Sequence, residues 1–264
     1  MEKLEITFLG TGTSNGVPVV GCNCTVCHSQ DAKDSRLRTS ILLQTEQICV
    51  MVDTSPDFRV QCLRENIQEV DAVLYTHAHA DHVLGFDDLR HFCERKNCEL
   101  PVYGIPETLT RIKRMFSYVF EEIGDSTRSY SNYIRLHFRE IREGFTLGDL
   151  HIVPVDLPHG VFTTVGFVFY HAGRKALAYY TDCSSVPKQA ESEAKGVAVL
   201  VIGALRYAPH PTHLTVQGAL KVAKTLDSRT CYFTHMGHEL QHTKIQSCLP
   251  SGVFPAYDGL RVHI

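Results

Sequence analysis

Apolar runs recur along the chain, some continuous and some alternating with polar residues, and Gly, Pro and Asp separate them. Short runs with such boundaries are typical of β-strands. The predicted strands cover residues 4–9, 40–43, 48–52, 71–74, 134–138, 150–155, 165–170, 176–180, 197–202 and 230–233.

Helical signals lie between several of these strands. Pro56, Pro106 and Pro187 stand at positions typical of a first helical turn, and Thr215 is a predicted N-cap. Strands in hairpin-like pairs that are mixed with helices indicate an α/β protein in which helices cover two sheets.

No repeat, low-complexity stretch or Pro/Ser-rich linker divides the sequence, so we predict one domain over residues 1–264. The least regular segments are residues 10–38, 117–132 and 236–250, and long irregular segments often carry function. The first of them is rich in glycine but lacks the Gly-Lys-Ser/Thr of a phosphate-binding loop. We therefore do not expect a nucleotide-binding loop.

Composition narrows the class of protein. The 264 residues are 44% hydrophobic and carry a formal net charge of -3, with 26 Lys and Arg against 29 Asp and Glu. No apolar run approaches the roughly 18 residues of a membrane-spanning helix, and the N-terminus lacks the features of a signal peptide. We therefore expect a cytoplasmic protein without a membrane partner, and the absence of a basic patch makes nucleic acid an unlikely ligand.

Histidine and cysteine are unusually frequent, with 15 His and 10 Cys in a chain that has no Trp. This usage indicates metal or redox chemistry. In a reducing compartment the cysteines are expected to be metal ligands, core thiols or reactive groups rather than a disulfide framework.

The strongest chemical signal is the hexapeptide His-Ala-His-Ala-Asp-His that follows the predicted strand at residues 71–74. Side chains at i and i+2 of an extended turn project the same way, so His77 and His79 can bind one metal ion. Asp81 and His82 are then turned toward a second ion. Separate histidines without a metal are a poor alternative here, because four polar side chains beside a buried strand are costly to desolvate.

Three further candidates, His159, Asp182 and His235, follow other apolar strands. Taken singly, each of them is better explained as an ordinary core or surface residue. Imidazole and carboxylate groups together suit Zn²⁺, Mn²⁺ or Fe²⁺, and an Asp that bridges two ions completes the paired-metal site of a hydrolase.

A second cluster of metal-binding residues lies in an N-terminal zinc loop at residues 21–28. Cys22, Cys24 and Cys27 supply three thiols, and a closed structural zinc site needs a fourth ligand. His238 is the candidate because it stands three residues after His235, and His28 is the local competitor. A disulfide or free thiols are the alternatives to zinc.

The hexapeptide and the three later residues, in this order, resemble the metallo-β-lactamase superfamily of hydrolases, and the resemblance covers essentially the whole chain. It implies a four-layer αβ/βα sandwich and two metal ions. By this resemblance the ligands of the first ion are His77, His79 and His159, those of the second ion are Asp81, His82 and His235, and Asp182 bridges the pair.

The Cys-x-Cys-x-x-Cys loop, combined with a histidine three residues after the last active-site histidine, narrows the resemblance. It is similar to the PhnP-type cyclic-phosphate phosphodiesterases of the carbon-phosphorus lyase pathway and their relatives. In similar phosphodiesterases a histidine between a strand and a helix acts as general acid. The His-Pro-Thr-His pattern makes His213 the better match, with His210 as the alternative and as a pocket residue. Arg206 is a further candidate for contact with the substrate phosphate.

The sequence thus predicts a phosphodiesterase with two Zn²⁺ or Mn²⁺ ions in the active site and one structural Zn²⁺. It would hydrolyse a small or cyclic phosphodiester, such as a phosphoribosyl cyclic phosphate, by attack of a metal-bridging hydroxide. We expect His213 and Asp81 to act in catalysis. The alternatives are a tRNA 3′-processing endonuclease and a non-hydrolytic metal-binding carrier related to cofactor biosynthesis. The family resemblance also indicates a homodimer.

Overall fold

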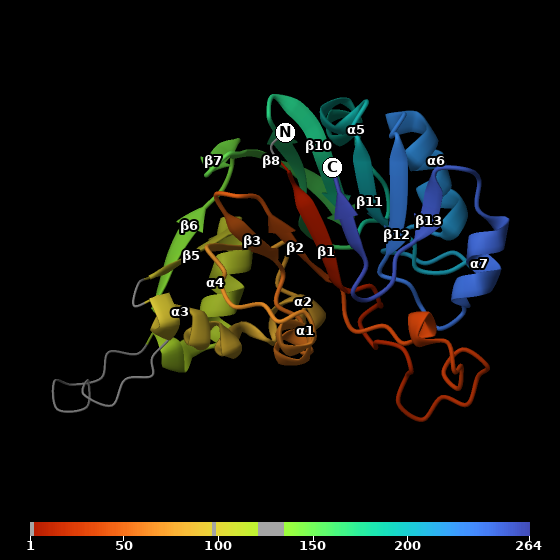
Figure 1. Ribbon diagram of the computed structural model, residues 1–264, viewed down its shortest axis with the longest axis horizontal. Coiled ribbons are helices and arrows are strands. Elements are labelled where there is room, and N and C mark those ends of the chain that lie inside the picture. Colours follow the sequence, from red (N-terminus) through yellow and green to blue (C-terminus); the bar gives the residue numbers. More distant parts are fainter. Residues whose placement is uncertain (1–2, 97–98, 121–134) are drawn as a thin grey trace, which may run out of the picture.

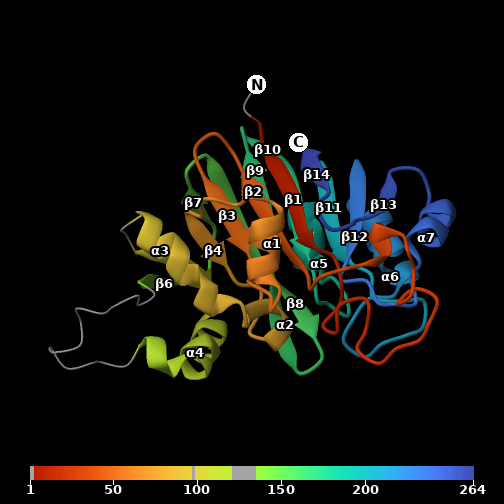
Figure 2. The same ribbon diagram turned by 60° about the horizontal axis from the view of Figure 1, so that its bottom comes forward.

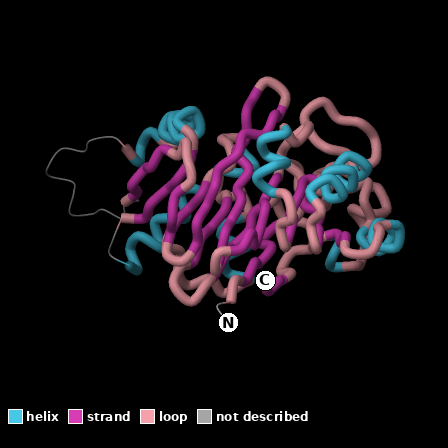
Figure 3. Tube along the Cα trace, turned by 90° about the horizontal axis from the view of Figure 1, so that it is seen from above, coloured by secondary structure: helices cyan, strands magenta, loops and turns pink. Residues whose placement is uncertain are grey.

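Two mixed β-sheets, each covered by helices on its outer face, form the body of the protein (Figure 1). The computed structural model describes residues 3–96, 99–120 and 135–264. Figure 3 shows the strands in the middle of the molecule, with helices on the flanks.

The first sheet has the strand order β14-β1-β2-β3-β4-β5-β6. Its first four strands are antiparallel, and β3 to β6 run parallel. The strands are β14 (Arg261–His263), β1 (Glu5–Gly10), β2 (Ser40–Gln44), β3 (Cys49–Val52), β4 (Ala72–Leu74), β5 (Leu100–Gly104) and β6 (Leu136–Glu140).

The second sheet has the order β13-β12-β11-β10-β9-β8-β7. Here β10 to β13 run parallel, and β7 to β10 are antiparallel. The strands are β13 (Val253–Pro255), β12 (Thr230–Thr234), β11 (Val199–Gly203), β10 (Arg174–Tyr180), β9 (Phe162–His171), β8 (Leu150–His159) and β7 (Phe145–Leu147).

The helices belong to two groups. Those connected to the first sheet are α1 (Phe58–Arg64), α2 (Ala80–Val83), α3 (Arg90–Lys96) and α4 (Pro106–Met115). Those connected to the second sheet are α5 (Lys188–Ala194), α6 (Val216–Leu226) and α7 (His242–Cys248). Short 3-10 turns lie at Ala32–Asp34, Phe86–Leu89 and Ser117–Val119. None of the described helices is long and apolar enough to cross a membrane.

Three clusters of buried apolar side chains fill the spaces between the layers. One lies between the sheets and includes Phe8, Phe167 and Tyr179. A second packs α1, α3 and α4 onto the first sheet. A third packs α5, α6 and α7 onto the second sheet. The predicted four-layer α/β sandwich is therefore confirmed.

Helix α6 shows how the sequence specifies a covering helix. The Thr215 side chain accepts a hydrogen bond from the Gly218 N–H at 3.1 Å, which caps the first turn. Apolar residues then recur at three- and four-residue spacing and form the buried face of the helix. These residues are Val216, Ala219, Val222, Ala223 and Leu226.

Most predicted elements are present, and the helices predicted at Pro56, Pro106, Pro187 and Thr215 correspond to α1, α4, α5 and α6. The prediction of an irregular segment at residues 236–250 is wrong, because α7 lies within it. Only His242 and Ile245 are buried in this helix, so its apolar periodicity is weak. Most of the segment 117–132 and the start of the strand predicted at 134–138 lie outside the described residues.

The strand predicted at residues 150–155 is too short, because β8 continues to His159. Pro154 and Pro158 interrupt the apolar pattern there and favour an early end. Among the described residues, β7 pairs only with Leu150, His151 and Ile152 of β8, and the later part of β8 has β9 alone as its neighbour. Proline is tolerated on such a free edge because no N–H is needed there.

Candidate metal centre

Five strands end at one edge of the sandwich, and polar residues lie at each of these ends. Asp53 follows β3, the hexapeptide follows β4, His159 ends β8, Asp182 follows β10 and His235 follows β12. The pairs β3–β4 and β11–β12 are parallel, so their carboxyl ends meet at the same edge, where ligand sites tend to form.

The hexapeptide changes conformation halfway along. His79 is extended, with φ of -72° and ψ of 153°, and α2 begins at the next residue. The extended part turns His77 and His79 toward each other, with His77 Nε2 2.9 Å from His79 Nδ1. Asp81 and His82 lie in α2, and the helical turn directs them to the second group of donor atoms.

Three residues at these strand ends have left-handed backbones. The φ angles are 63° at Asp53, 39° at Asp182 and 54° at His235. This conformation is unfavourable for a residue with a Cβ, and each instance costs about 1–3 kcal/mol. Strain of this kind persists where the surrounding structure holds it and is concentrated at functional sites.

The first group of donor atoms comes from His77, His79, His159 and Asp182. Asp182 Oδ2 lies 3.7 Å from His77 Nε2 and 3.8 Å from His159 Nε2. All four donor atoms lie within 4.8 Å of one another. Except for His79, whose burial is intermediate, these residues are buried.

The second group comes from Asp81, His82, His235 and again Asp182. His82 Nε2 lies 3.3 Å from Asp81 Oδ2 and 3.4 Å from Asp182 Oδ2. His235 Nε2 lies 3.5 Å from Asp81 Oδ2 and 3.1 Å from Asp182 Oδ1. Asp182 therefore belongs to both groups, at the position that the sequence assigns to a bridge.

These separations fit a bound metal ion. Ligand nitrogen and oxygen atoms at zinc bond lengths stand about 3.3 Å apart at the corners of a tetrahedron. His82 Nε2 and His235 Nε2 are buried and make no hydrogen bond within the described residues. A buried imidazole nitrogen that points at carboxylate oxygens without a hydrogen bond is typical of a metal ligand.

Charge states in the cluster follow from burial and from the neighbouring charges. Burial opposes ionisation of Asp182, but the imidazoles of His235 and His82 outweigh it and hold its pKa well below the usual value. Burial lowers the pKa of His77 well below the ordinary histidine value. The Asp182 carboxylate and the neutral His77 imidazole are the protonation states that metal binding requires.

Asp53 is a functional candidate that the sequence analysis missed. Its Oδ2 lies 2.7 Å from His82 Nδ1 and accepts a hydrogen bond from the Thr76 hydroxyl at 2.8 Å. Asp53 is buried. Its contact with His82 Nδ1 fixes the tautomer of His82 and leaves Nε2 directed toward Asp81 and Asp182. His159 is oriented similarly, with its Nδ1 2.9 Å from the Thr212 carbonyl oxygen.

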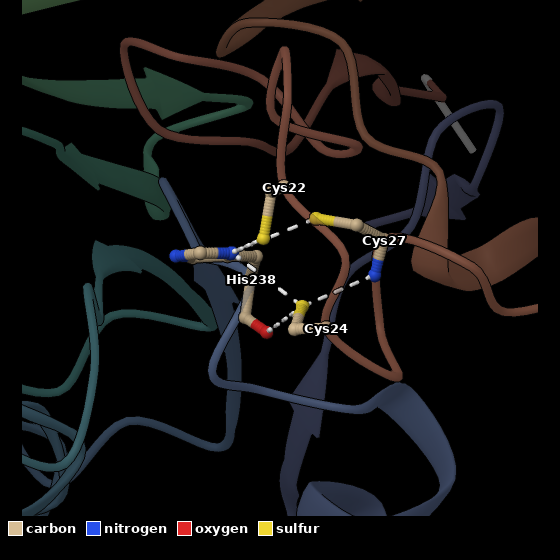
Figure 4. A group of neighbouring side chains, drawn as sticks. All are labelled: Cys22, Cys24, Cys27 and His238. Atoms are coloured by element: carbon tan, nitrogen blue, oxygen red, sulfur yellow. Dashed lines mark hydrogen bonds between the residues drawn. The ribbon is translucent and has the colours of Figure 1, made fainter.

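The three loop thiols surround one imidazole nitrogen (Figure 4). His238 Nδ1 lies 3.2 Å from Cys22 Sγ, 3.6 Å from Cys24 Sγ and 3.5 Å from Cys27 Sγ. Tetrahedral zinc would place sulfur and nitrogen ligands about 3.6 Å apart. The Cys27 N–H donates to the Cys24 sulfur and lowers the pKa of that thiol to about 6. The structure brings His238 to the cluster, whereas His28 faces the backbone of its own loop.

His213 lies between the two donor groups. Its ring centroid is 4.7 Å from that of His159 and 4.8 Å from that of His235. Burial lowers the pKa of His213 to about 3. The ring of His210 stands 5.0 Å from that of His213, and the Thr212 N–H donates to His210 Nδ1 at 3.3 Å.

Arg206 is directed toward its own loop. Its guanidinium donates to the carbonyl oxygens of Ala208 and Pro209 at 3.3 and 3.1 Å. It also pairs with Glu239 at 3.8 Å. The predicted contact of Arg206 with the substrate phosphate therefore has no structural support.

A cavity of about 410 Å³ opens onto the donor groups. Gly160, in the turn after His159, lines it with a left-handed φ of 65°. A Cβ at this position would lie 2.7 Å from Thr212 Cγ2, so the close contact with the loop that carries His213 requires glycine. The other lining residues are Ser14, His79, Asp81, His159, Val161, Phe162, Asp182, Thr212, His213 and His235.

Comparison with known proteins identifies the family. A profile of the β-lactamase superfamily domain matches residues 49–236. A crystal structure described as a new diphosphatase from the PhnP family is 36% identical, with a TM-score of 0.89, and the match covers 98% of this chain and 97% of that chain. The chain belongs to the metallo-β-lactamase superfamily of hydrolases and, within it, to the PhnP family.

Curated relatives carry other names. The octanoyltransferase of Porphyromonas gingivalis is 36% identical over 99% of this chain, but the chain spans only 52% of that protein. Coenzyme PQQ synthesis protein B of Methylorubrum extorquens is 26% identical, over 75% of this chain and 72% of that protein. The short form of human tRNase Z is 18% identical with a TM-score of 0.70, and the match covers 98% of both chains, which shows the fold alone.

Asp53→Asn should weaken metal binding at the paired site, because the neutral amide accepts a weaker hydrogen bond from His82 Nδ1–H than the carboxylate does. A loss of about 10- to 100-fold in affinity is typical when such a supporting group is changed. Competition titration with a chromophoric chelator measures it. Asp57→Asn is the matched control, since Asp57 pairs with Arg38 outside the donor groups. Unchanged affinity in Asp53→Asn would show that Asp53 does not support His82.

Cys24→Ser should remove one zinc ion per chain and lower the Tm by about 5 °C or more, the shift that roughly 2 kcal/mol produces in a domain of this size. Elemental analysis and calorimetry of the same samples provide both values. Cys248→Ser is the control, because Cys248 is exposed and lies outside the cluster. A Tm that stays the same after confirmed zinc loss would refute a structural role.

Proposed function

We propose that this protein is a dinuclear metal-dependent phosphodiesterase that hydrolyses a small or cyclic phosphodiester, such as a phosphoribosyl cyclic phosphate. The observation that carries the proposal is the shared carboxylate. Asp182 Oδ2 lies 3.7 Å from His77 Nε2 in one donor group and 3.4 Å from His82 Nε2 in the other. The likeness to a PhnP-family diphosphatase supports a phosphoryl substrate.

Two Zn²⁺ or Mn²⁺ ions held here would activate a water molecule and neutralise charge on the phosphoryl oxygens. The seven proposed donors come from four strand ends, with four donors in the hexapeptide after β4 and one each at the ends of β8, β10 and β12. Asp53 and the Thr212 carbonyl fix the orientations of His82 and His159. The donors proposed for the first ion are His77, His79 and His159, those for the second ion are Asp81, His82 and His235, and Asp182 is shared.

His213 is the proposed proton donor to the leaving alkoxide. It contacts a proposed ligand of each ion, so a substrate that spans both ions lies beside its ring. With its pKa at about 3 the free imidazole is neutral at pH 7. A bound anionic phosphodiester would act to raise that pKa, because an adjacent negative charge favours the imidazolium, whereas bound metal ions would act to lower it. Proton donation by His213 therefore requires the bound substrate.

Two other functions are weaker proposals. A tRNA 3′-processing activity has only the fold likeness to tRNase Z behind it, and the chain has a net charge of -3. A non-hydrolytic carrier role has the likeness to the PQQ synthesis protein. We favour turnover because a candidate acid stands beside a full set of seven donors. Octanoyl transfer is not assigned to this chain, which spans about half of the octanoyltransferase.

Protein loaded with Zn²⁺ or Mn²⁺ should hydrolyse bis(p-nitrophenyl) phosphate. His213→Ala should lower kcat by about 100-fold or more, the usual contribution of a positioned acid, on a cyclic or dialkyl phosphodiester whose alkoxide leaving group needs a proton, with unchanged metal content. His210→Ala is the matched variant and should have the smaller effect, because this ring faces Thr212. Absence of turnover at full metal occupancy would reject the enzyme, and equal effects of the two variants would reject His213 as the acid.

A further inference from the structure

A second and larger cavity adjoins the metal centre. Its volume is about 680 Å³, and it shares His79, Val161 and Phe162 with the first cavity. The start of α4, the hairpin between β8 and β9, and the segment that follows β6 form its walls. His213 lines the first cavity and not the second, so the second cavity lies away from the proposed acid.

Two arginines line this second cavity without a carboxylate partner. Arg111 lies on α4, and Arg142 follows β6. The arginine ion pairs of the described residues all involve other arginines. Glu107 and Asp156 also line the cavity, yet neither neutralises a guanidinium by direct pairing. The two guanidinium groups are therefore available to an anion.

Phe162 joins the arginine side of the cavity to the metal centre. Its ring centroid lies 5.2 Å from that of His79, at an interplanar angle of 87°. The Arg111 guanidinium carbon lies 4.9 Å from the same Phe162 ring, at cation–π distance. The Phe162 ring thus separates the Arg111 guanidinium from His79, a proposed metal ligand. A single small molecule can span the distance between them.

We propose that Arg111 and Arg142 bind a second anionic group of the substrate, a phosphate or carboxylate on the part of the molecule that does not face His213. The inference rests on the proposed function, because the scissile phosphoryl group must lie at the metal centre. Guanidinium groups bind such anions through charge-assisted, often bidentate hydrogen bonds. The substrate class is then a small phosphodiester with two separate anionic groups. A simple diester lacks the second anionic group.

Titration calorimetry on zinc-loaded protein tests this without requiring turnover. Three probes share a propyl chain and one phosphate and differ at the other end, namely 3-hydroxypropyl phosphate, propane-1,3-diyl bisphosphate and 3-aminopropyl phosphate. The bisphosphate should bind about tenfold or more tightly than the hydroxyl compound, as expected for hydrogen bonds to charged groups. The ammonium compound should bind no more tightly than the hydroxyl compound.

The Arg111→Ala/Arg142→Ala variant should lose the preference for the bisphosphate, and metal content and Tm verify that it is folded. Should the double variant not fold, Arg142→Ala alone should reduce the preference. Arg114→Ala is the control, because it removes the same charge from α4 outside the cavity. Equal binding of bisphosphate and hydroxyl compound by the unaltered protein, or a preference that survives in the double variant, would overturn the proposal. Tighter binding of the ammonium compound would also overturn it, since Glu107 and Asp156 would then dominate.

The two proposals fail in different ways. Absence of bis(p-nitrophenyl) phosphate hydrolysis rejects the phosphodiesterase and leaves the affinity ratio measurable. Hydrolysis that is accompanied by equal affinities rejects the arginine site and leaves the phosphodiesterase standing.

Discussion

Two carboxylates and five imidazoles, all of them buried or half-buried, lie together at one edge of the sandwich, and the rest of the structure depends on this concentration of donor groups. Ionised carboxylates are costly to bury unless opposite charges and hydrogen bonds compensate them. Within the chain the compensation falls on His82, whose pKa rises well above its ordinary value, because Asp182, Asp81 and Asp53 outweigh the effect of burial. Two metal ions would complete the compensation, and the backbone strain at Asp182 and His235 is then part of holding them.

Two segments that are distant in sequence pack together next to the second sheet and support the metal centre there. The irregular loop after β1 lies beside the segment between β12 and α7 (Figure 2), and Thr13 N–H donates to the Met236 carbonyl at 3.2 Å. Arg36, fully buried beside Asp34, donates to the carbonyl oxygens of Gly237 and Leu240 at 3.1 and 2.6 Å. The thiol cluster joins the same two segments through His238. Zinc bound there would therefore stabilise the chain next to His235.

The sequence predicted the sandwich and the residues of both donor groups, because apolar runs and a dense hexapeptide are local signals. His159, Asp182 and His235 needed the resemblance to a family, since a single polar residue after a strand has no pattern of its own. Asp53 was missed for the same reason, because its role depends on its contact with His82 across two strand ends. The proposed role of Arg206 depended on loop conformation, which sequence does not specify, and the structure directs that side chain to its own backbone.

In the proposed centre, Asp182 would join two metal ions. Electron paramagnetic resonance of the protein loaded with two Mn²⁺ per chain at this site distinguishes a joined pair from two separate ions. Ions about 3.5–4 Å apart that share a carboxylate are magnetically coupled, so the loaded protein should give the broad multiline spectrum of a coupled pair. Asp182→Ala should replace it with the six-line spectrum of isolated Mn²⁺. A six-line spectrum from the fully loaded, unaltered protein would show that Asp182 does not join two ions.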